Sequence, residues 1–95
     1  MDIVIIFGHH DTKNSFNAAI RDTFVEEANR LGHQTDVINL FEEKEQLPFY
    51  RSDINPPPQI VLDYRERLEK ADMMFLIGSC HNLRLNAILE NWVDW

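Results

Sequence analysis

A polar segment follows the first apolar run of the chain and contains residues suited to hold an anion. The run at residues 4–7 ends at Gly8, and Ser15 and Asn17 come next, at the expected start of an amphipathic helix. The first turn of a helix offers unpaired backbone N–H groups and a partial positive charge, which together bind phosphate. The spacing therefore indicates a phosphate site for a nucleotide or a flavin. The alternative is that Ser15, or Asn14 beside it, only caps the helix.

Histidine and cysteine residues in the loops after the first and third apolar runs allow two other chemistries. His9, His10, Asp11 and His81 would suit zinc, because imidazole and carboxylate are zinc ligands. They lack the dense spacing of the H-x-x-x-H type, so we predict no metal site. Cys80 has no Lys or Arg beside it to lower the pKa of its thiol, and we expect no nucleophilic role.

The chain has 44% hydrophobic and 26% charged residues, which is ordinary for a globular protein, and we predict one domain of residues 1–95. A net charge of −7 disfavours nucleic acid as a partner, since binding a phosphate backbone requires clustered Lys and Arg. No apolar run approaches the ~20 residues of a membrane span. The single cysteine and the start without a basic, apolar leader predict a cytoplasmic location.

The elements that would position these residues alternate along the chain. Apolar runs predict strands at residues 2–7, 35–40 and 73–77, the third fully buried. Amphipathic spacing predicts helices at residues 15–31, ended by Gly32, and at residues 60–71, begun by Pro58; a third covers residues 86–95. Residues 46–58, which end in three prolines, and residues 78–85 are predicted as loops.

Strands joined by helices must be parallel, and their crossovers are right-handed. The sequence therefore predicts an α/β fold with a three-layer α/β/α arrangement, a parallel sheet of strand order 2-1-3 and the first strand in the middle. In this fold we expect Phe16 and Trp92 to pack in the core.

Four sequence motifs occur in register along the whole chain. They are Gly8-His9, Ser15-Phe16-Asn17-Ala18, Tyr64-Arg65-Glu66-Arg67-Leu68 with Ala71-Asp72, and Ala87-Ile88-Leu89 with Trp92 and Asp94. Together they resemble the flavodoxin-like NAD(P)H:quinone oxidoreductases, which include mammalian quinone reductases, bacterial drug-activity modulators and ancillary flavoproteins of potassium efflux. The resemblance covers only the N-terminal half of such a protein, with the later strands absent.

The resemblance implies a function and its cofactors. Members of the group bind a flavin, FAD or alternatively FMN, and transfer hydride from NAD(P)H through it to a quinone or a similar acceptor. The alternative for this chain is a non-catalytic truncated relative, or a regulatory interaction module, that has lost the flavin site.

By position, the resemblance also implies cofactor-binding residues. His9, with His10 as the alternative match, lies near the pyrophosphate, and Ser15, Phe16 and Asn17 wrap the phosphates. The stretch Ser79, Cys80, His81 and Asn82 faces the isoalloxazine ring, at a place where relatives commonly have Pro-x-x-Trp. This stretch contains neither proline nor tryptophan.

The third strand predicts how the chain assembles. Without a fourth strand beside it, residues 73–77 form an apolar edge with no charge or proline to block pairing. Such edges recruit partners, so we expect a homo-oligomer or a separate chain that supplies the missing half, and no stable monomer.

Overall fold

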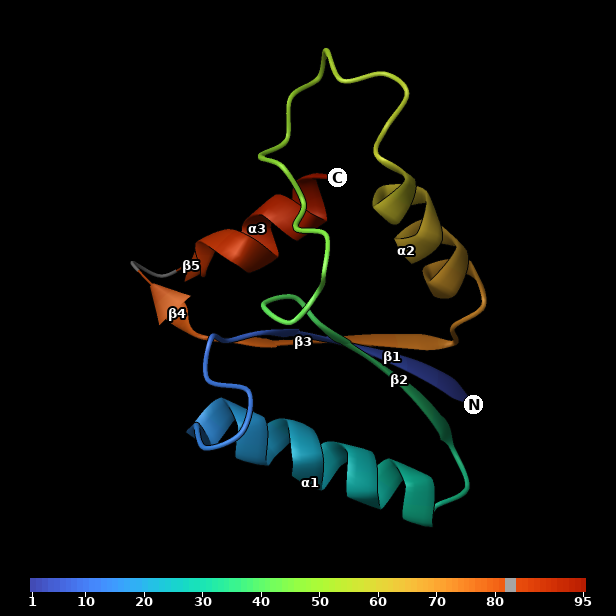
Figure 1. Ribbon diagram of the computed structural model, residues 1–95. Coiled ribbons are helices and arrows are strands. Elements are labelled where there is room, and N and C mark those ends of the chain that lie inside the picture. The colour runs from blue at the N-terminus through green and yellow to red at the C-terminus, as the bar shows by residue number, and fades with distance from the viewer. Residues whose placement is uncertain (82–83) are drawn as a thin grey trace.

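The computed structural model describes residues 1–81 and 84–95, without the side chains of residues 80, 81 and 84. A three-stranded sheet lies between one helix on one face and two helices on the other (Figure 1). The elements in chain order are β1 (Asp2–Gly8), α1 (Phe16–Arg30), β2 (Gln34–Asn39), α2 (Gln59–Glu69), β3 (Met73–Gly78), β4 (Cys80–His81), β5 (Arg84–Leu85) and α3 (Ala87–Asp94).

The sheet is parallel and has the order β2-β1-β3, which confirms the predicted strand order. Ile5 of β1 lies opposite Val37 of β2 on one side and Phe75 of β3 on the other. The side chains from Ile3 to Phe7 are all buried, because β1 has a neighbour at each edge and helices over both faces.

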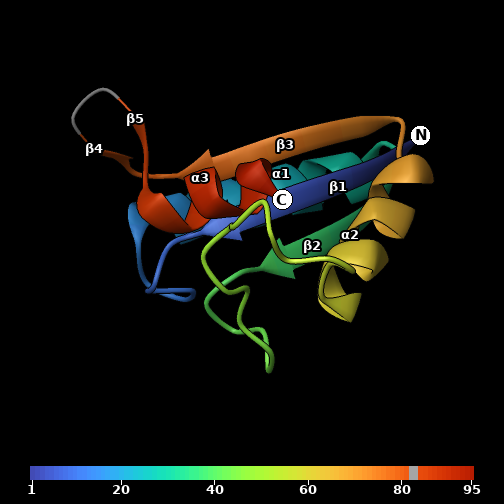
Figure 2. The ribbon, with the colours of Figure 1, turned by 90° about the horizontal axis from the view of Figure 1, so that it is seen from above.

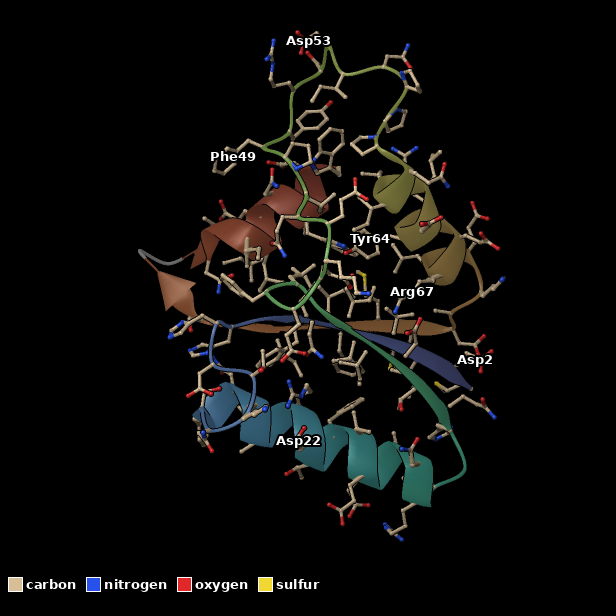
Figure 3. All side chains as sticks on the ribbon, in the orientation of Figure 1. Asp2, Asp22, Phe49, Asp53, Tyr64 and Arg67 are labelled. Carbon is tan, nitrogen blue, oxygen red and sulfur yellow. The ribbon has the colours of Figure 1, made fainter. Side chains whose placement is uncertain are left out.

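Successive β1 side chains point to opposite faces of the sheet and so enter two separate cores. Val4 and Ile6 pack with α2 and α3 in the larger core, where Tyr64 and Trp92 are the aromatic members. Ile3 and Ile5 pack against α1 around Ala28 in the smaller one. The side chains of both cores fill the space between the helices and the sheet (Figure 3).

The helix boundaries follow local chemistry. Ser15 is the N-cap of α1, and Gly32 takes a positive φ of 88° one residue past the C-cap, as predicted. Pro58 occupies the N-cap position of α2 instead of its first helical position. Asn86 is the N-cap of α3.

Two predictions, one about the third strand and one about the residues after it, are wrong. The third strand is not fully buried, because no strand pairs with the outer edge of β3 in the described part of the chain. Met73, Met74 and Phe75 are 40%, 47% and 37% exposed. The stretch predicted as a loop at residues 78–85 contains the antiparallel pair β4 and β5, which is too short to produce a sequence pattern.

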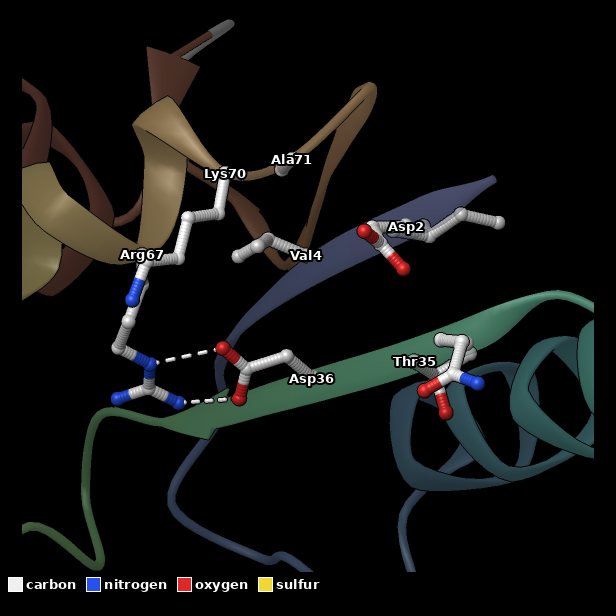
Figure 4. A pocket seen from close by; sticks show the side chains of 9 residues that line it. Asp2, Val4, Thr35, Asp36, Arg67, Lys70 and Ala71 are labelled. Carbon is white, nitrogen blue, oxygen red and sulfur yellow. Dashed lines mark hydrogen bonds and ion pairs between the residues drawn. The ribbon is translucent and has the colours of Figure 1, made fainter.

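An ion pair connects β2 to α2 beside a cavity of about 210 Å³ (Figure 4). Arg67 donates from Nε and Nη2 to the two carboxylate oxygens of Asp36, at 2.8 and 2.5 Å. These hydrogen bonds lower the pKa of the Asp36 carboxyl and raise the pKa of the Arg67 guanidinium. Both side chains are partly exposed, so water screens the pair and limits what it adds to stability.

In the described residues, no helix has both the length and the apolar character that crossing a membrane requires.

We predict that Asp36→Asn lowers the free energy of unfolding at neutral pH by less than about 1 kcal/mol. The folded pKa of Asp36 lies below its unfolded value of about 3.9, so the pair's contribution is present above that pH and is lost as pH falls further. Urea unfolding of both proteins from neutral pH downward measures the difference, which should shrink toward zero in acid. Asp53→Asn, in the exposed pair with Arg51, is the control. A difference that stays constant with pH contradicts the prediction.

Candidate functional site

The carboxyl ends of β1 and β3 form the floor of the candidate site, and two glycines let α3 lie directly on them. A Cβ at Gly8 would stand 2.6 Å from Leu89 Cγ, and one at Gly78 would stand 2.3 Å from Leu89 Cδ1. Leu89 is fully buried, so its side chain has no room to give way. The glycines therefore bring the first turn of α3 against the end of the sheet.

The loop between β1 and α1 is held by its own aspartate. The Asp11 carboxylate accepts the backbone N–H of Asn14 at 2.8 Å and that of Lys13 at 3.1 Å. These hydrogen bonds lower the pKa of the Asp11 carboxyl below its ordinary value. The Asp11 N–H in turn donates to His9 Nδ1 at 3.0 Å, so the proton of a neutral His9 ring is on Nε2.

Ser15 connects this loop to the helix. Its Oγ accepts the Ala18 N–H at 3.0 Å and donates to the Asp11 carbonyl oxygen at 2.7 Å. Ser15, and not Asn14, is therefore the N-cap. The hydroxyl and the helix N-terminus lie where a phosphate was predicted, and the phosphate role stays a prediction.

Side chains from the N-terminal ends of α1 and α3 make contacts across the end of the sheet. Asn17 Nδ2 donates to Ser79 Oγ at 3.2 Å, a contact between residues 62 positions apart. Asn86 Nδ2 donates to the Gly8 carbonyl oxygen. Asn86 Oδ1 is buried and has no hydrogen-bond partner among the residues described.

A cavity of about 310 Å³ opens between these loops. The His9 and His10 rings stack with centroids 4.5 Å apart, and His10 meets the edge of Phe41 at 6.4 Å. The cavity thus has an aromatic wall and a polar wall. Its lining residues are His9, His10, Phe41, Ser79, Asn86, Ala87 and Ile88.

The structure brings together His9, Ser79 and, through its hydrogen bond, Asn17 of the predicted site residues. Phe16 is 81% exposed on α1, so the prediction that it packs in the core is wrong. It occupies the first helical position, beyond the reach of the sheet. Asn82 and the side chains of Cys80 and His81 lie outside the described residues.

In the described part of the chain, no group of three or more His, Cys, Asp or Glu side chains is placed to hold a metal ion.

Arg21 lies beside the candidate site and was not identified from the sequence. It donates to the Thr12 carbonyl oxygen at 2.6 Å and to Asn39 Oδ1 at 3.0 Å, and its guanidinium lies 4.5 Å from the centre of the Phe7 ring. It thereby ties the loop before α1 to the ends of β1 and β2. The sequence feature that could have identified Arg21 is its position one helical turn after Asn17, on the same helix face.

A family model described as a flavodoxin-like fold matches residues 1–95. The chain belongs to this flavodoxin-like family. The match confirms the family resemblance predicted from the four sequence motifs, and it covers the loops that form the candidate site.

Two solved structures share the fold of this flavodoxin-like chain. One is an NAD(P)H:quinone oxidoreductase from Methanothermobacter marburgensis, with a TM-score of 0.86 and 24% identity over 99% of this chain and 51% of that one. The other is a putative quinone reductase from Klebsiella pneumoniae, with a TM-score of 0.85 and 18% identity over 99% and 44%. The chain spans about half the length of these neighbours. No curated protein matches it.

We predict that Arg21→Gln lowers the free energy of unfolding by about 1.5–3 kcal/mol, because two partly buried acceptors lose a charged donor. The Arg21 side chain is only 11% exposed. The matched control on the same helix is Arg30→Gln, whose side chain is 66% exposed and which should stay within about 0.5 kcal/mol of wild type. Urea unfolding of the three proteins tests the prediction, and equal effects of the two substitutions would refute it.

Proposed function

We propose that this chain, as one domain of residues 1–95, binds a flavin and belongs to an NAD(P)H-dependent oxidoreductase of the quinone reductase kind in the cytoplasm. The observation that carries the proposal is the hydrogen bond from Asn17 to Ser79, which joins the first turn of α1 to the segment after β3, where Ser79 lines the 310 Å³ cavity. In open parallel sheets, ligands bind in the crevice at the carboxyl ends of the strands. Membership of the flavodoxin-like family also supports a ligand site at this edge of the sheet.

The residues around this crevice fit a flavin in part. Asn17 and His9 would donate to the phosphate from the amide and the imidazole at the helix N-terminus, and Ser15 would join them once its hydroxyl turned from the Asp11 carbonyl oxygen. The cavity beside them is at the lower end of the size range of small-molecule sites. FAD fits the proposal, and FMN is the alternative.

When bound, a flavin would accept hydride from NAD(P)H and deliver two electrons to a quinone or similar acceptor. The chain's own residues would bind and orient the cofactor and exclude water, and none of them is proposed as an acid, base or nucleophile.

The Asp11 carboxylate opposes phosphate binding. It holds the N–H groups of Lys13 and Asn14, two of the donors that a phosphate at this loop would use. Its negative charge would also repel the phosphate. Binding therefore requires Asp11 to turn away and release these donors.

A second candidate is a non-catalytic interaction module that retains the fold without the cofactor. The occupation of the loop donors by Asp11 favours it, because the loop is hydrogen-bonded without a ligand. Titration of wild-type protein into FMN and FAD, followed by flavin fluorescence, separates the two functions. A fluorescence change that saturates supports the oxidoreductase proposal. No change with either flavin overturns it in favour of the module.

We predict that Ser15→Ala combined with Asn17→Ala weakens flavin binding several-fold to a hundredfold, because hydrogen bonds to charged groups contribute ~1.5–3 kcal/mol each. The matched control is Thr23→Ala with Asn29→Ala on the same helix, which should leave affinity unchanged. Thermal unfolding accompanies the titration, since loss of the Ser15 cap alone costs about 1 kcal/mol. Unchanged affinity in a folded double variant would refute the phosphate site.

We predict that Asp11→Asn strengthens flavin binding by about threefold or more, because it removes the charge that repels the phosphate. Asp22→Asn, an equal change of charge on the exposed face of α1, is the control and should alter affinity less. Calorimetric titration at low salt measures both. Weaker binding by the Asp11 variant than by wild type would show that the carboxylate supports the bound state.

A further inference from the structure

The loop before α1 contains a hydrogen bond that depends on the protonation state of one side chain. His9 Nδ1 accepts the backbone N–H of Asp11 at 3.0 Å, which only a neutral imidazole ring can do. A protonated ring has N–H groups on both nitrogens, so two donors would face each other and this hydrogen bond would be lost. Imidazole is the side chain whose charge ordinarily changes between about pH 5 and about pH 8. A proton gained in that range therefore acts directly on the loop.

A second imidazole ring lies against the first. The rings of His9 and His10 stack with centroids 4.5 Å apart and an angle of 21° between their planes. Simultaneous charge on both rings is opposed by their mutual repulsion, which an anion beside the stack would offset. The N–H groups of Asn14 and Lys13 lower the pKa of the Asp11 carboxyl most, and the charges of His9 and His10 lower it further. The two rings and the carboxylate therefore lie close enough to attract each other when a ring is protonated.

We propose that protonation of the His9–His10 pair opens the loop before α1 to a phosphate. This switch acts on the phosphate site of the proposed function and rests on it. With both rings neutral, the Asp11 carboxylate holds the N–H groups of Lys13 and Asn14. A proton from solvent on His9 Nδ1 breaks the hydrogen bond to the Asp11 N–H and attracts the Asp11 carboxylate to the ring, which frees all three N–H groups. Anion binding and protonation then favour each other by the same factor.

Charges from two neighbouring elements meet this loop at Thr12 and are opposite in sign. The Arg21 guanidinium of α1 donates to the Thr12 carbonyl oxygen at 2.6 Å, and the Glu42 carboxylate accepts from Thr12 Oγ1. Figure 2 shows the loop beside the start of the segment after β2, at the end of the sheet where α3 begins. Lys13 in the loop itself is exposed, so water screens its charge. The cavity lining contributed by the segment after β3 and the start of α3 is uncharged and consists of Ser79, Asn86, Ala87 and Ile88.

NMR titration of the ligand-free 95-residue protein from about pH 8 to about pH 5 tests the opening of the loop. We expect the amide signals of Asp11, Lys13 and Asn14 to shift with the midpoint of the His9 ring signals, because protonation removes their hydrogen bonds. His9→Gln should abolish these shifts, since the glutamine amide does not gain a proton, and the same spectra show that the variant is folded. His33→Gln, in the turn before β2 at the opposite end of the sheet, is the matched control and should leave them unchanged. Amide signals that do not follow the His9 ring in the wild-type protein overturn the proposal.

FAD titrations followed by flavin fluorescence, at about pH 5.5 and about pH 8, measure the effect on the proposed site. FAD is the suitable probe because its pyrophosphate keeps the same charge between these pH values, whereas a phosphate monoester such as FMN gains a proton at about pH 6. We expect wild type and His33→Gln to bind FAD about threefold or more tighter at the lower pH. His9→Gln should lose most of that difference, while the change in net charge of the rest of the chain affects all three proteins alike.

The outcomes separate this switch from the proposed function. FAD binding by wild type that is equal at both pH values, or stronger at the higher one, overturns the switch and leaves the flavin proposal intact. An equal loss of the difference in His33→Gln and His9→Gln also overturns the switch. If FAD binds at neither pH, the proposed function is wrong, and sulfate, a dianion at both pH values, replaces FAD with the Lys13 and Asn14 amide signals as the readout. Tighter sulfate binding in acid that His9→Gln removes supports the switch, and equal binding at both pH values overturns it.

Discussion

Burial of β1 on both faces is the constraint on which the rest of the structure depends. Its side chains from Ile3 to Phe7 are at most 4% exposed, and those from Ile3 to Ile6 divide between two cores, so this one strand fixes where all three helices lie. Each such side chain contributes about 1.5–3 kcal/mol through burial. The strand also sets the site, because Gly8 at its end allows the approach of Leu89 and thus places the start of α3 beside the loop after β1.

The fold could be predicted because its signals are local or periodic. The apolar run of β1, the helical spacing of α1 and the glycine at position 32 each indicate structure within a few residues. The degree of burial of the β3 side chains could not be predicted from the same kind of signal, since an apolar run has the same pattern whether or not other elements cover it. The contacts of Arg21 with Thr12 and Asn39, and of Asn17 with Ser79, were also hidden, because they depend on how the loops meet in space.

The loop after β1 shows how unpaired helix donors are satisfied without a ligand. A helix N-terminus leaves N–H groups unpaired, and Ser15 accepts that of Ala18 in the first turn of α1, while Asp11 accepts the N–H groups of Lys13 and Asn14 in the loop before it. The same carboxylate that stabilises the loop would oppose an anion there. Stability of the free protein and affinity for a phosphate are therefore opposed at Asp11, a conflict that is common where a site is built from a helix terminus.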